Sequence, residues 1–222
     1  ATAEAVRSRE LTSQEASALL PACICSGPSF VILTVGEQLL GSRTAGVCLF
    51  AAQVLAGWLT AALLCRVRGI PEPLPAPPAA AQTEPPPALD TILAQAAVTY
   101  LKLCGFVLYF RLLAAGCGLL LPAMLLEVCS GCDYAARTGL WASGLCCAAL
   151  SVQGTSVLLQ VRTLCPPEVS FKPLLWGRVL HLPLSLALFY LGLPERAVES
   201  FNTLCSRVVP MRRVPTDCAL LV

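Results

Sequence analysis

The uncharged stretch AGVCLFAAQVLAGWLTAALLC, residues 45–65, decides the class of the protein. Its 21 residues match the length of about 20 that an α-helix needs to cross the hydrocarbon core of a bilayer. It ends at Arg66 and Arg68, and arginines are frequent where a helix leaves the membrane on the cytoplasmic side. The stretch therefore predicts a transmembrane helix.

The rest of the chain repeats this pattern. Of the 222 residues, 56% are hydrophobic and 13% charged, and the mean hydropathy is +0.73, well outside the composition of a soluble domain. No alternation typical of a barrel strand occurs, so helices must satisfy the backbone within lipid. We predict an all-α polytopic membrane protein that contacts the lipid bilayer. Further apolar blocks cover residues 103–126, 140–161 and 174–193.

A proline-rich segment divides the chain into two halves. Residues 71–87 contain eight of the 18 prolines and no apolar periodicity, which is typical of an extended linker outside the bilayer. The sequence predicts four parts: a first half, a linker, a second half and a polar tail. Their boundaries are 1–69, 70–88, 89–193 and 194–222.

The first half contains a helix that breaks. Thr12 and Glu15 have the spacing of a capping box and predict a helix start. That helix meets the pair Gly27-Pro28, where proline removes a backbone donor and crowds the preceding turn. The remaining 13 residues, 29–41, are too few to span a bilayer alone. We expect a broken or re-entrant helix.

The second half has a comparable interruption. Glu127 follows an apolar run, and Gly131 offers a place for the chain to turn. Polar residues, among them Ser151 and Gln153, then interrupt the next apolar block. Two broken segments in two halves are typical of a transporter site, because unwound backbone is tolerated at membrane depth where protein or a water-filled cavity covers it.

Four stretches resemble the YlbJ-type sporulation integral membrane proteins of the nucleoside-recognition, or Gate, domain family: ATAEAVRSRELTSQEASALLPACICSGPSFVILTVGEQLLGSRTAG, LLEVCSG, ALSVQGTS and WGRVLHLPL. The resemblance covers residues 5–193 in order. It implies a transporter of a small anionic solute such as dipicolinic acid in a bacterial cell or forespore membrane. Related Gate domains imply a nucleoside or ion transporter as the alternative. The family's earlier membrane segments have no counterpart here, so we expect a truncated start.

We predict that the two breaks and three charged or titratable groups form the solute pathway. An intramembrane carboxyl is a functional candidate by default, but Glu127 is equally well explained as a turn cap. Arg178 and His181 share a helix face and suit an anion. For Arg178 we favour the alternative that it snorkels to the headgroups, and His181 is then satisfied inside the bundle. The role of Arg111 stays open. The predicted pathway residues are Gly27, Pro28, Ser29, Glu127, Ser151, Gln153, Arg178 and His181.

Other function classes have weaker support. Cys129 and Cys132 form a CxxC motif, but no second CxxC or thioredoxin-like pattern accompanies it. No catalytic triad, phosphate-binding loop or metal-ligand cluster occurs, so we expect no enzyme, metal or cofactor. The net charge of +2 does not favour nucleic acid. A redox protein, or a non-transporting scaffold that assembles as an oligomer or with a partner chain, remains an alternative.

Basic residues give conflicting signals for orientation. Arg66 and Arg68 place the linker in the cytoplasm by the positive-inside rule, and four arginines argue the same for the tail. Arg162, Lys172 and Arg178 favour the opposite assignment. If the linker and the tail lie on the same side of the membrane, the block 140–161 must enter the membrane and return to the face from which it entered.

Overall fold

The computed structural model describes residues 12–68 and 88–192. The predicted tail lies outside these residues, as does the predicted linker except for its last residue, Ala88. Every regular element within them is a helix, which confirms the all-α class. Four helical segments are long and apolar enough to cross a membrane, which confirms a polytopic membrane protein. These segments are Arg43–Val67, Leu89–Cys117, Gly139–Leu164 and Lys172–Gly192.

Helix α2, Ser13–Cys23, begins with the predicted capping box. The backbone N–H of Glu15 donates to Thr12 Oγ1 at 3.2 Å, and the Thr12 N–H donates to Glu15 Oε2 at 2.7 Å. The helix ends at Ile24, whose backbone is extended. The chain therefore leaves the helix before Gly27-Pro28, which confirms the predicted break.

After the break, Ser29–Leu39 forms the π-helix η1, which packs against α3, Arg43–Arg68. The two backbones touch at a glycine pair. A Cβ on Gly36 would lie 2.4 Å from the Gly46 Cα, and real Cβ atoms do not approach backbone so closely. Glycine is required here because it allows this approach.

The expected span 103–126 was wrong in its boundaries. Helix α4 covers Leu89–Cys117 and ends at Gly118, whose φ of 64° favours glycine. Two short helices follow, α5, Leu120–Leu126, and α6, Val128–Ala136. They form a hairpin, because a Cβ on Gly131 in α6 would lie 2.9 Å from the Met124 Cα in α5.

The turn of this hairpin is at Glu127. The expectation that Gly131 makes the turn was therefore wrong, since Gly131 lies within α6 and allows close packing instead.

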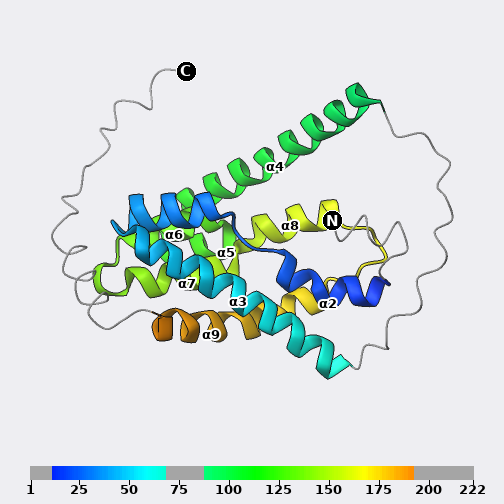
Figure 1. Ribbon diagram of the computed structural model, residues 1–222. Coiled ribbons are helices and arrows are strands. Elements are labelled where there is room, and N and C mark those ends of the chain that lie inside the picture. The colour runs from blue at the N-terminus through cyan, green and yellow to red at the C-terminus, as the bar shows by residue number, and fades with distance from the viewer. Residues whose placement is uncertain (1–11, 69–87, 193–222) are drawn as a thin grey trace, which may run out of the picture.

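The predicted interruption in the second half is present at Gln153. It separates α7, Ala142–Val152, from α8, Gly154–Leu164, after a short 3-10 helix, η2, Gly139–Trp141. Gln153 has a φ of 61°, which side-chain-bearing residues rarely adopt. Figure 1 shows α7 and α8 continuing in one direction across the bundle. The last described helix is α9, Lys172–Gly192.

The packed centre of the molecule contains α2, α3, α7 and α9. Fully buried apolar side chains such as Leu49, Leu150 and Phe189 belong to one core cluster that also includes residues of η1 and α6. Helix α4 contacts α5 and α8, with fewer contacts to α6, and stands away from the centre (Figure 1).

The order of the helices bears on orientation. Between the end of α3 and the end of α9 there are three candidate crossings, α4, α7–α8 and α9, and one hairpin, α5–α6. If all three cross, these two ends lie on opposite sides of the membrane. The α5–α6 hairpin would then be the segment that enters and returns, and the block 140–161 would cross.

Candidate functional site

The guanidinium of Arg178 is the centre of a buried polar cluster. Arg178 is 8% exposed, in the first half of α9. Its Nη2 donates to the carbonyl of Ile24 at 3.0 Å and to Gln153 Oε1 at 3.1 Å. Its Nη1 is 3.5 Å from the Ser151 carbonyl. The expectation that Arg178 snorkels to the headgroups was wrong, because α9 is turned so that this face meets the helix breaks.

Three helix breaks converge beside this guanidinium. Gln153, at the α7–α8 break, donates from Nε2 to the carbonyl of Ile24, where α2 ends, at 3.3 Å. A Cβ on Gly154 would lie 2.9 Å from the backbone nitrogen of Glu127, so the same break touches the tip of the α5–α6 hairpin. Thr155 Oγ1 reinforces this contact by donating to the Leu125 carbonyl at 2.8 Å.

The convergence explains why the chain breaks its helices. A helix end leaves carbonyl and N–H groups unpaired, and burying such a group in an apolar environment without a partner costs about 1–3 kcal/mol. At this site the carbonyl of Ile24 accepts from both Arg178 and Gln153. The breaks are therefore stabilised by long-range contacts between the two halves of the chain.

A second polar layer continues from the cluster towards α3. Gln53 Nε2 donates to Ser151 Oγ at 3.0 Å and to the carbonyl of Cys147 at 3.1 Å. The hydroxyls of Ser151 and Ser185 are hydrogen bonded to each other. His181 Nε2 lies 3.1 Å from the Gln53 carbonyl. Since a carbonyl only accepts, this nitrogen carries the proton and Nδ1 of the neutral ring is an acceptor.

Within residues 12–68 and 88–192, two nitrogen atoms of the cluster have no partner. Arg178 Nε and His181 Nδ1 are both buried without a hydrogen bond. The residues are three apart on α9, so they lie on the same face of the helix. The cluster thus offers an unused donor and an unused acceptor. Within the described residues the one ion pair joins Arg137 to Asp133 on the exposed surface, so the charge of Arg178 has no counter-ion there.

Glu127 has a local structural role in this geometry. Its carboxylate, 1% exposed, accepts from the backbone N–H groups of Cys129 at 2.9 Å and Ser130 at 2.7 Å. It therefore caps the start of α6, where the helix dipole stabilises negative charge. No hydrogen bond joins it to Arg178 or His181 in the described residues. Of the two explanations for Glu127, the structure shows the cap.

The expected pathway residues of the first break lie outside the cluster. Gly27, Pro28 and Ser29 are exposed at the start of η1. The structure brings the carbonyl of Ile24 to the cluster instead. Ser151, Gln153, Arg178 and His181 are brought together as predicted, but at the α7–α8 break rather than around Gly27.

Sequence reasoning missed two side chains of the cluster. Gln53 and Ser185 are 3% and 0% exposed. A signal was present for Gln53, the one amide within the uncharged stretch 45–65, because polar residues in transmembrane helices usually face the bundle interior. Ser185 gave no such signal, since serine is common in membrane helices.

The other candidate features are metal-ligating side chains, the CxxC motif and two hollows. Within the described residues no three metal-ligating side chains gather. Cys129 and Cys132 of the CxxC motif are free thiols. A hollow of about 640 Å³ lies between α4 and α8, and one of about 260 Å³ between α3 and α9. Neither is lined by a residue of the Arg178 cluster.

Comparison with known proteins identifies no relative: no family model, no curated protein and no solved structure matches the chain.

Proposed function

We propose that the protein is a membrane transporter in which a small anionic solute binds at the Arg178 cluster. The observation that carries the proposal is the buried guanidinium, which among the described residues has neutral partners and no carboxylate. A buried charge is costly unless it is paired. An anion from solution would supply the missing negative charge.

The surrounding backbone supports this function. Interrupted helices at membrane depth are tolerated where protein or a water-filled cavity covers them, and transporters form their substrate sites from such segments. Gln153 lies at the fifteenth position of the 26-residue segment Gly139–Leu164, near its middle. Three breaks and a buried cation at this depth resemble a binding site more than a structural contact between helices.

The two buried nitrogen atoms without a described partner suggest what kind of anion fits. Arg178 Nε is an unused donor for an anionic oxygen, and His181 Nδ1 is an unused acceptor for a hydroxyl or a protonated acid. A carboxylate that also carries an O–H or N–H donor satisfies both. The resemblance to YlbJ-type proteins makes dipicolinate the first solute to test, and the Gate-domain alternative makes a neutral nucleoside the natural comparison.

Uptake into proteoliposomes tests the proposal. We expect the wild-type protein to take up labelled dipicolinate faster than protein-free vesicles, and R178Q to lower kcat/KM about ten- to hundredfold, the loss of one charged hydrogen bond. R162Q is the matched control, because Arg162 is exposed near the end of α8 over the ring of Phe171.

Three outcomes decide the matter. Loss in R178Q with normal uptake in R162Q and an unchanged far-UV circular dichroism spectrum supports the anion site. Uptake of uridine but not of dipicolinate overturns the assignment of an anionic solute. No uptake of either solute above protein-free vesicles contradicts transport.

A further inference from the structure

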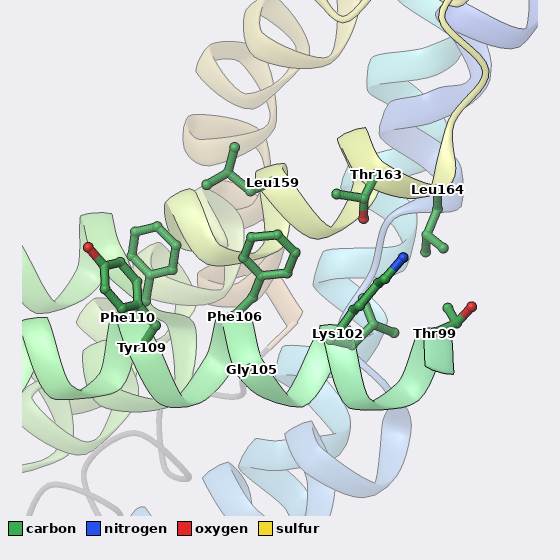
Figure 2. A pocket seen from close by; sticks show the side chains of 10 residues that line it. Thr99, Lys102, Gly105, Phe106, Tyr109, Phe110, Leu159, Thr163 and Leu164 are labelled. Atoms are coloured by element: carbon green, nitrogen blue, oxygen red, sulfur yellow. The ribbon is translucent and has the colours of Figure 1, made fainter. Parts of the chain in front are cut away.

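The hollow between α4 and α8 has one polar and one apolar end. Figure 2 shows the amine of Lys102 reaching from α4 towards Thr163 and Leu164 at the end of α8. The rings of Phe106 and Phe110 lie further along α4, opposite Leu159. The lining contains one charged residue, Lys102, and no acidic one. Such a hollow matches an amphiphile with an anionic head.

The two ends of the hollow lie at different levels along α4 and α8. Thr163 and Leu164 are the last residues of α8, after which the chain leaves the helix for a loop with two prolines. The polar end is therefore level with the point where α8 ends. Phe110 is eight residues from Lys102, or about 12 Å along the helix. The apolar end thus lies further along α4, on the side where α8 runs into the bundle.

The environment of α4 favours a lipid as the occupant. None of its most apolar 18-residue stretch is buried, so lipid has access to the helix. Lys102 is exposed and makes no ion pair within the described residues. A volume of about 640 Å³ lies within the usual range of ligand pockets. Basic pockets between transmembrane helices are known to bind anionic lipid headgroups.

We propose that this hollow binds an anionic phospholipid, with the phosphate at Lys102 and one acyl chain along Phe106, Phe110 and Leu159. The hydroxyls of Thr99 and Thr163, which also line the hollow, are neutral donors for the headgroup. The lipid would fill the space between α4 and α8. This site is separate from the Arg178 cluster, and the inference does not depend on transport.

Lipid retention tests this inference. The protein is released from nanodiscs that contain equal amounts of phosphatidylglycerol and phosphatidylcholine, and bound lipids are counted by native mass spectrometry. We expect preferential retention of one phosphatidylglycerol by the wild type, and about fivefold weaker retention by K102Q, the effect of one basic residue near an anionic surface. R111Q is the matched control, because Arg111 is exposed on the same helix and does not line the hollow.

The named outcomes separate the lipid site from general attraction. An equal loss of phosphatidylglycerol retention in K102Q and R111Q would show general charge attraction without a binding site and would overturn the proposal. Equal retention of phosphatidylcholine would overturn the role of the anionic head. A second variant, L159W, should reduce retention by filling the apolar end, and unchanged retention in L159W would contradict the placement of the acyl chain.

Discussion

Helices α4 and α9 have almost the same mean hydropathy over their most apolar stretches, yet their surroundings are opposite. None of that stretch of α4 is buried, against 33% of that of α9. Both helices carry a basic residue in an apolar block. Arg111 of α4 is exposed, and Arg178 of α9 is buried among the helix breaks. Hydropathy therefore identifies a span but does not show which face meets lipid and which meets protein.

The difference arises from the neighbours of each helix. Helix α9 packs against α2, α3 and α7, two of which end at a break. Their free carbonyls need donors, and Arg178 supplies them. Helix α4 is continuous over 29 residues and packs against short helices at the edge. Substitutions at the breaks should therefore lower the free energy of unfolding much more than matched substitutions in α4.

The largest expected effect is that of a methyl group at Gly154. Its φ of 69° is unfavourable for alanine, and the added Cβ would lie 2.9 Å from the Glu127 nitrogen. Strain and overpacking together should lower the free energy of unfolding by about 3 kcal/mol or more in G154A. Unfolding by denaturant in mixed micelles measures this loss.

The matched variant in α4 is G105A. Apart from the local backbone of α4, no atom of the described residues lies within 4 Å of an added Cβ there, and alanine favours a helix over glycine by up to about 1 kcal/mol. G105A should therefore be neutral or slightly stabilising. Equal destabilisation of both variants would break the distinction between the packed centre and α4.

An intermediate effect is expected for the amide of Gln53. In Q53A the hydroxyl of Ser151 and the Cys147 carbonyl lose a donor, so the free energy of unfolding should fall by about 1–2 kcal/mol. Q160A is the control, since Gln160 bonds the neighbouring Ser156 within α8. A loss in Q160A as large as that in Q53A would show that the cluster contributes no special stability.

A smaller effect is expected at the start of α2. The backbone N–H and then the hydroxyl of Thr12 hold the pKa of the Glu15 carboxyl below its ordinary value. The contribution of Glu15 is therefore fully present above the ordinary carboxyl pKa and is lost as the pH falls from there through the lowered pKa of the folded state. T12A should lower the Tm at neutral pH by about 2–4 °C.

The difference in Tm between T12A and the wild type should shrink in acid. Helix α4 offers the reverse experiment, because Ala88 provides no side-chain cap. A88S should raise the Tm slightly. A pH-independent difference for T12A would show that the hydrogen bond from the Thr12 hydroxyl to the Glu15 carboxylate does not contribute to the cap.

The sequence predicted those features that depend on local chemistry. Thr12 with Glu15 caps a helix without tertiary contacts, and this capping box was confirmed. The break expected at Gly27-Pro28 was also confirmed, although α2 ends at Ile24, before the proline. The break at Gln153 was located by its polar neighbours. Its positive φ was not, because glutamine has no preference for that conformation and the contact of Gly154 with the hairpin holds it there.

Features set by packing between distant segments could not be predicted. Gly131 looks like a turn residue, but glycine is required at this position because the backbone of Met124 approaches it closely. Arg178 lies in the first half of α9, where an arginine usually extends to the headgroups. Its actual partners, Ile24 and Gln153, are 154 and 25 residues away. No local pattern indicates which of these the side chain will meet.

Direct binding of an anion is the measurement that tests the central claim most closely. Isothermal titration of the purified protein in detergent with dipicolinate should give a saturable heat for the wild type and for R111Q. The affinity of R178Q should be at least about tenfold weaker, because the one charged donor of the cluster is lost. An affinity in R178Q equal to that of the wild type, or no binding to the wild type at all, would contradict the account.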